Sequence, residues 1–125
     1  MTTYGPAFLG SDAPAAEPKQ LYFEDVEEGT DISKSKGPLS VTDLVVFAGA
    51  SGDFNPIHHD REHSKGPASL PDIILHGQCK IAFLGHLLTD WVGLHGRIKK
   101  LGGQYRGMDI PGTPVTAKGV VTKKY

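Results

Sequence analysis

The most constraining feature of this 125-residue sequence is a long helical pattern between positions 78 and 91. Apolar or small residues recur there at helical spacing, at Ile81, Ala82, Leu84, Gly85, Leu88 and Trp91. A stripe of this width predicts a helix from Gln78 to Trp91 that is buried over much of its circumference. Such a helix constrains the fold, because the rest of the chain has to cover it.

The sequence after this helix has residue patterns typical of β-strands. Residues 98–106 and 115–121 both read as strands, and the second of these segments is rich in β-branched side chains. Pro111 and Gly112 predict a turn between them. Together with the long helix, these segments indicate an α+β fold.

The sequence before residue 40 carries weaker signals. Residues 1–20 hold several glycines and prolines without a sustained period, which is typical of a flexible N-terminal arm or of a segment that packs over a partner subunit. Residues 21–23 are apolar and are followed by Gly29, which suits a first strand or the approach to one. We therefore expect one folded domain over residues 21–125.

Composition excludes several classes of protein. An apolar share of 38% with 22% charged residues favours a soluble globular domain, and a net charge of -1 gives no electrostatic footprint for nucleic acid. The single cysteine, Cys79, cannot form an internal disulfide. No secretory signal or membrane-spanning run is evident, so a cytoplasmic protein without membrane association is expected.

A second helix is predicted just before the most polar loop of the chain. Ser40 and Asp43 have the spacing of a capping box, and apolar residues follow at helical positions up to Ala48. Gly49 and Gly52 are expected to close this helix. Pro56 then disfavours helix at the residue before it, so residues 53–58 should form an irregular loop.

Three groups near this loop could carry acid–base chemistry. Adding water across a polarised double bond needs a base, an acid and a hydrogen-bond donor for the developing oxyanion. Asp53, His58 and the amide of Gly77 at a helix start supply these roles. Each also has a structural interpretation: Asp53 as a turn residue, His58 as a hydrogen-bonding loop residue, and Gly77 as a site of close packing. His76 either bonds backbone near the site or is a core residue.

Two ordered motifs carry a family resemblance. The first is formed by Ser51, Gly52, Asp53, Asn55, Pro56 and His58, and the second by an aliphatic residue, His76 and Gly77. The sequence resembles the MaoC-like, R-specific enoyl-CoA hydratases, which carry both motifs in this order. The resemblance implies a hot-dog fold, in which an antiparallel β-sheet wraps a long central α-helix. It also implies homodimers, or higher oligomers of dimers, with the active site near the subunit interface and a tunnel for the acyl chain.

The resemblance also assigns roles to residues. Asp53 and His58 correspond to the family's catalytic pair, and Gly77 to its oxyanion amide. Asn55 and His76 are expected to bind substrate. The substrate would be an acyl-CoA thioester, so no separate cofactor is expected, because CoA is part of the substrate.

Two departures from the family pattern stand out. Gly85 occupies the position where some of these hydratases have a serine, which removes a polar contact there. The sequence also stops at Tyr125 within a strand-like segment, so two alternatives are expected: the domain lacks its last strands and exposes a sheet edge, or the sheet is completed in some other way. Two other functions remain open, a non-catalytic acyl-CoA-binding subunit of a hetero-oligomer and an acyl-CoA thioesterase.

Other reactive side chains are expected to be structural. Cys79 in the first turn of the long helix has no base positioned for it, so a buried packing role is predicted. His58, His59 and His63 with Asp60 lack the further carboxylates that a metal site would need, so no metal is expected.

Overall fold

The computed structural model describes residues 20–125 of the chain. In chain order, the elements are η2 (Phe23–Asp25), β1 (Lys34–Lys36), α1 (Val41–Ser51), η3 (Pro56–His58), α2 (Arg61–Lys65), α3 (Gly77–Val92) and β2 (Val115–Ala117). Helices and an antiparallel strand pair confirm the predicted α+β class. The expected arm lies outside the described residues, apart from Gln20.

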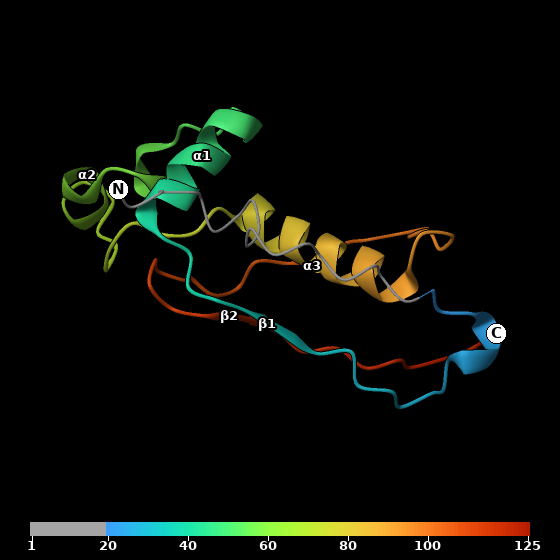
Figure 1. Cartoon of the computed structure of the whole chain (residues 1–125). Coiled ribbons are helices and arrows are strands. Elements are labelled where there is room, and N and C mark those ends of the chain that lie inside the picture. Colours follow the sequence, from blue (N-terminus) through green and yellow to red (C-terminus); the bar gives the residue numbers. More distant parts are fainter. Residues whose placement is uncertain (1–19) are drawn as a thin grey trace, which may run out of the picture.

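A long β-ribbon runs beside α3 (Figure 1). Strands β1 and β2 pair antiparallel with Lys34 opposite Ala117, and an isolated bridge between Asp31 and Val120 continues the same register. The amide of Gly29 extends this ladder by donating to the carbonyl of Val121 at 2.8 Å. The second predicted strand is therefore present in this ribbon, with its regular part confined to β2.

Residues 21–23 do not form a strand themselves, and they lie on the approach to one, which was the other role expected for them. The chain forms the 3₁₀ turn η2 there, because the carboxylate of Asp25 accepts a hydrogen bond from the amide of Tyr22 at 3.2 Å. The aromatic side chains of Tyr22 and Phe23 are 62% and 58% exposed. An apolar run therefore became an exposed turn, and the first strand lies further on at β1.

Helix α3 confirms the longest predicted element, extended by one residue at each end. Its expected burial is found in part, because Cys79 and Leu87 are buried and Ile81, Leu84, Gly85, Leu88 and Trp91 are half-buried, whereas Ala82 is exposed. The β-ribbon covers one side of α3 (Figure 1). No helix among the described residues is long and apolar enough to cross a membrane.

The expected strand at residues 98–106 is also wrong. A strand is stable only when its amides and carbonyls pair with a neighbouring strand. Among residues 20–125, the single sheet has two strands, β1 and β2, and neither pairs with this segment. The predicted turn at Pro111 and Gly112 is present, with Gly112 at a φ of 89° and its amide donating to the carbonyl of Leu39.

Helix α1 begins at its predicted capping box and ends at Gly52, whereas Gly49, the other glycine expected to close it, lies inside the helix. The Ser40 hydroxyl accepts from the amide of Asp43 while the Asp43 carboxylate accepts from the amide of Ser40, which completes the capping box. Gly52 ends the helix in the left-handed region at a φ of 75°. Helix α1 thus runs to Ser51, three residues beyond the predicted end, and the polar loop follows it directly.

The main core lies where α1 meets the start of α3. It joins five buried residues, Leu39, Leu44, Ile73, Leu75 and Cys79, with Phe47 packed against them. Burial raises the pKa of the Cys79 thiol, which keeps it protonated. Cys79 is therefore a packing residue, and this core fixes α1, residues 73–75 and α3 relative to one another.

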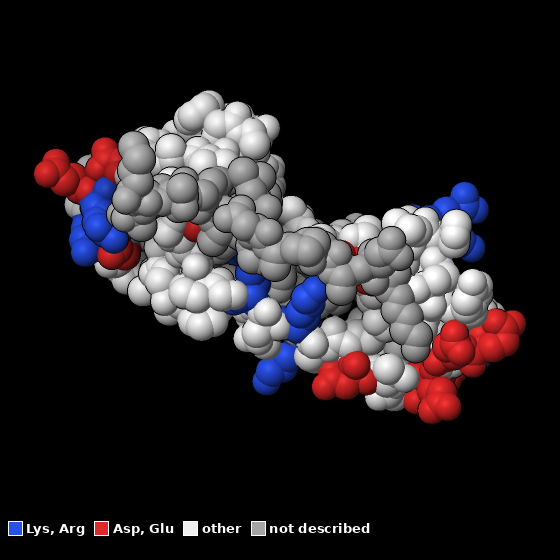
Figure 2. All heavy atoms as spheres, viewed as in Figure 1, with Lys and Arg blue, Asp and Glu red and all other residues white. Residues whose placement is uncertain are grey.

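Acidic side chains gather mainly toward the two ends of the molecule, whereas basic side chains also lie over its middle (Figure 2). At the α2 end, Asp72 binds Arg61 at 3.0 Å and Lys65 at 3.6 Å. Exposed ion pairs of this kind contribute about 0 to 1 kcal/mol each. They nevertheless tie α2 to the segment that leads into α3, and the polar loop lies between these elements.

Candidate active site

Local hydrogen bonds hold the loop between α1 and α2 in shape. The amide of Asn55 donates to Oδ1 of Asp53 at 3.3 Å, and Oδ1 of Asn55 accepts from the amide of Ile57 at 3.2 Å. Pro56 opens η3, where its fixed φ suits the first helical position. The predicted irregular loop therefore contains one short 3₁₀ turn, and the Asn55 side chain is committed to capping it.

His58 is oriented by a main-chain carbonyl. Its side chain is buried, and Nδ1 lies 2.7 Å from the carbonyl oxygen of Ile74. Because a carbonyl can only accept, Nδ1 carries the hydrogen and donates it. In the neutral ring the opposite nitrogen, Nε2, is then an acceptor.

That acceptor faces the carboxylate of Asp53. Nε2 of His58 lies 3.8 Å from Oδ2 of Asp53, which is longer than a hydrogen bond of about 2.7 to 3.2 Å. A water molecule within hydrogen-bonding distance of both atoms can bridge such a separation. The structure thus brings the two predicted catalytic side chains together at a spacing suited to one shared water.

His76 is fully buried beside this pair. Its Nε2 lies 3.2 Å from the main-chain carbonyl oxygen of Asp53, and its ring stacks on that of His58 with centroids 3.8 Å apart and planes inclined by 21°. The Phe47 ring packs on it at 4.9 Å. Nδ1 of His76 is buried and has no hydrogen-bond partner among residues 20–125, a situation that costs about 1 to 3 kcal/mol.

Gly77 opens α3 directly after His76. As the first residue of the helix, it has no carbonyl one turn earlier to accept from its N–H. A Cβ atom at this position would lie 2.8 Å from Cδ2 of Tyr105, well inside contact distance. Both interpretations of Gly77 are therefore compatible with the structure. Its amide is suited to bind an oxyanion, and its lack of a side chain lets the Tyr105 ring pack closely.

Asp53, His58 and His76 each offer a possible metal-ligand atom, and these atoms lie within 4.8 Å of one another. Imidazole lone pairs lie in the plane of the ring, and the two rings are stacked nearly parallel. Their lone pairs therefore lie in two offset planes and do not converge on one ion. This geometry disfavours a metal between them.

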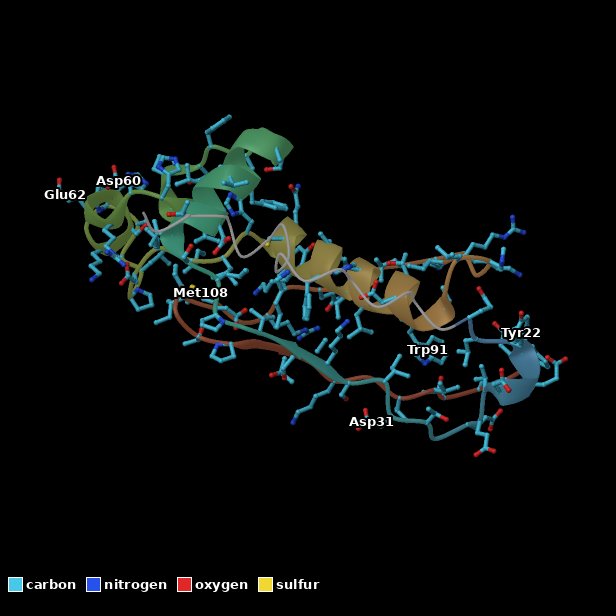
Figure 3. The ribbon with its side chains drawn as sticks, in the orientation of Figure 1. Tyr22, Asp31, Asp60, Glu62, Trp91 and Met108 are labelled. Carbon is cyan, nitrogen blue, oxygen red and sulfur yellow. The ribbon has the colours of Figure 1, made fainter. Side chains whose placement is uncertain are left out.

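The histidines and aspartate further along are used locally. His59 donates from Nε2 to the carbonyl of Phe54 at 3.2 Å, and the Asp60 carboxylate accepts from the amide of His63 to cap α2. Asp60 and Glu62 lie at the outer end of the molecule (Figure 3). These contacts give structural roles to the members of the group formed by His58, His59, His63 and Asp60 that lie beyond His58.

One cavity among the described residues does not contain the pair. It has a volume of about 290 Å³ and lies between α3 and the β-ribbon, lined by Lys36, Leu39, Leu75, Cys79, Lys80, Ala82, Phe83, His86 and Val115. Its volume does not make it the active site, because chemistry requires the acid–base groups to line it. The acyl tunnel stays a prediction.

Sequence reasoning missed three parts of this site. The carbonyl of Ile74 orients His58, but a main-chain group leaves no residue signature in a sequence. Phe47 reaches His76 from α1, and nothing in the helical pattern of that segment pointed to this contact. Tyr105 lies in the segment expected to be a strand, and nothing in that pattern pointed to Gly77.

The fold should lose stability in acid partly through His76. Burial lowers the pKa of His76 from the ordinary 6.5, and the charge of His58 lowers it further, although the bond to Asp53 opposes this. The unfolded chain takes up this proton near pH 6.5 and the folded chain only below it. The contribution of His76 to the free energy of unfolding therefore falls as the pH drops below about 6.5.

Denaturant titrations between about pH 5 and 8 on the wild type and His76→Phe check this expectation. Toward acid, the wild type should lose stability relative to the variant, which has no titratable group at this position. Parallel curves for the two proteins would contradict it.

Comparison with known proteins places the chain in a family. The family model described as MaoC like domain matches residues 24–124. An (R)-specific enoyl-CoA hydratase from Rhodospirillum rubrum is 34% identical over 67 residues, which are 54% of this chain and 45% of that protein. The chain therefore matches less than half the length of that relative.

Solved structures share the fold. An (R)-hydratase from A. caviae, described as involved in PHA biosynthesis, aligns with a TM-score of 0.71 and 25% identity over 80% of this chain and 75% of that one. The ChsH1-ChsH2 complex from Mycobacterium tuberculosis aligns with a TM-score of 0.70 and 25% identity over 78% and 76%. These neighbours confirm the expected hot-dog fold, and the extent of the family match shows that the chain belongs to the family of MaoC-like domains.

Proposed function

We propose that this MaoC-like domain is an R-specific enoyl-CoA hydratase, which adds water reversibly to a trans-2-enoyl-CoA and gives the R-3-hydroxyacyl-CoA. The observation that carries the proposal is the 3.8 Å separation between Oδ2 of Asp53 and Nε2 of His58. Similarity to an (R)-specific enoyl-CoA hydratase supports this choice of reaction.

The pair is suited to hold and activate one water. A water between Oδ2 of Asp53 and Nε2 of His58 can donate one hydrogen to each, which leaves an oxygen lone pair free for the substrate. In hydration, the water oxygen bonds to the β-carbon and a proton is added to the α-carbon. Asp53 and His58 together take the proton from water and return a proton to the α-carbon, so that atoms and charge balance.

The negative charge that develops during this addition needs a donor. When the oxygen attacks the β-carbon, electrons move through the conjugated system to the thioester oxygen as an enolate. The amide of Gly77, at the positive end of the α3 dipole, is suited to donate to that oxygen. The thioester bond stays intact throughout, so no covalent nucleophile is required.

One assay separates this function from its alternatives. Purified protein is incubated with crotonyl-CoA, and the products are separated. Loss of the conjugated absorbance with CoA still attached is the result expected for a hydratase. Release of free CoA thiol would identify a thioesterase, and binding of crotonyl-CoA without turnover would identify a non-catalytic subunit.

The proposed enzyme is expected to act as a dimer or a larger assembly of dimers. The described sheet has only two strands and exposes ladder edges to pairing. One solved neighbour is itself a complex of two named components. Sedimentation at the assay concentration should show at least a dimer, and an active monodisperse monomer would refute this expectation.

A further inference from the structure

We propose that His76 is the positioning residue that locks the Asp53–His58 pair in place beside the Gly77 amide, without touching the substrate itself. This inference rests on the proposed function and deepens it. It replaces the expected substrate contact of His76 with an indirect role. The geometry that carries it is the convergence on one buried residue of two contacts of its ring and one covalent link through its main chain.

The first contact fixes the backbone of Asp53. The Asp53 carbonyl oxygen can only accept, so Nε2 of His76 donates to it at 3.2 Å. The two residues are 23 positions apart in the chain. This bond therefore joins the loop after α1 to the residue that precedes α3.

The second contact fixes the ring of His58. The His76 ring lies flat against it with centroids 3.8 Å apart, and the Phe47 ring supports His76 from α1. His58 is thus held between the stack and its bond to Ile74, which restricts both its tilt and its rotation. A group held this way loses little entropy when it meets the reacting water.

The third contact is covalent. His76 is the N-cap residue of α3, so the next peptide unit carries the amide of Gly77. Any shift of His76 moves that amide relative to Asp53 and His58 together. One side chain therefore couples all three groups proposed to act on water and thioester.

Packing alone does not account for a histidine at this position. Within the part of the chain that the structure describes, Nδ1 of His76 is buried without a hydrogen-bond partner, so the ring carries a polar atom at a cost to stability. A phenylalanine would fill a similar volume without that cost. The N–H of Nε2 is what phenylalanine lacks, which points to the bond with Asp53 as the reason for the histidine.

The test compares two variants that each keep one property of His76. His76→Phe keeps an aromatic ring and loses the donor, whereas His76→Gln places an amide N–H at the reach of Nε2 and loses the ring. His59→Ala is the matched control, because His59 also donates to a loop carbonyl, that of Phe54, but is exposed. Melting temperature, kcat and KM for crotonyl-CoA are measured on each protein.

The proposal predicts that His76→Phe lowers kcat about tenfold or more with KM nearly unchanged and the fold retained, since misplacement of reacting groups has effects of this size. His76→Gln should recover most of that loss, and His59→Ala should match the wild type. Equal activity in all variants would overturn the proposal. Equal losses in the Phe and Gln variants, or losses that follow melting temperature, would also overturn it by showing that the ring is needed only for packing.

A readout without turnover keeps this test independent of the proposed function. If the wild type does not hydrate crotonyl-CoA, the function fails while the positioning role is still testable by ¹⁵N NMR of the histidine rings. The wild type should show His58 with its hydrogen on Nδ1 and His76 with its hydrogen on Nε2. In His76→Phe, the signals of His58 and of the Asp53 backbone should shift or broaden, and unchanged signals would overturn the positioning role.

Discussion

Asp53→Asn and His58→Asn should each lower kcat for hydration of crotonyl-CoA by about a hundredfold or more, the scale of lost acid–base catalysis. Asn at position 53 keeps the shape of the side chain but removes its charge. Asn at position 58 can place an N–H where Nδ1 of histidine donates to Ile74, and it has no atom at the position of Nε2. Both variants therefore remove one contact to the shared water and leave the loop in place.

The double variant should lose far less than the product of the two single effects, because both groups act on one water. Glu62→Gln is the matched control, since this carboxylate lies on α2 at the outer end of the molecule (Figure 3). The measurements are kcat and KM together with melting temperature. Near-normal turnover in either single variant would remove that residue from the mechanism. If the loss of kcat in the double variant equals the product of the two single losses, the two residues act independently and not on one water.

Gly77→Ala is expected to damage both folding and turnover, for two separable reasons. The new Cβ would lie 2.8 Å from the Tyr105 ring, so that ring has to move. Tyr105 is 53% exposed, and its displacement should lower the melting temperature without unfolding the protein. The same methyl group would also crowd the thioester oxygen at the amide, with a loss of about a hundredfold in kcat, as found when oxyanion donors are lost.

Removal of Tyr105 separates these effects. In a Tyr105→Ala background, Gly77→Ala should leave the melting temperature unchanged, because the steric conflict is gone. The loss of kcat should persist there if the amide contacts the thioester. Recovery of turnover along with stability would instead show that Gly77 serves only to admit Tyr105, and the oxyanion donor would have to be found elsewhere.

The roles proposed for the motif residues depend on their contacts in the folded protein as well as on the motifs. The proposed water position between Asp53 and His58 depends on the carbonyl of Ile74, which fixes which nitrogen of His58 faces Asp53. His76 was expected to bind substrate, and its burial points instead to support of the pair. Asn55 shapes the loop through Ile57, which leaves its expected substrate contact as a prediction.

The sequence by itself determined the elements that local interactions decide. The capping box of Ser40 and Asp43, the left-handed end at Gly52 and the proline at position 56 each act within a few residues, so α1 and the loop after it were predictable. The apolar spacing of α3 was equally local. The order of the two motifs then sufficed to indicate the family.

Only the tertiary structure decided which of the remaining patterns became elements and how the site is held. Residues 98–106 have strand texture, yet a strand also needs a ladder partner, and pairing is a property of distant segments. The stack of His76 on His58, the Ile74 carbonyl and the Tyr105 ring over Gly77 join residues far apart in the chain or use main-chain atoms, so no residue pattern could encode them.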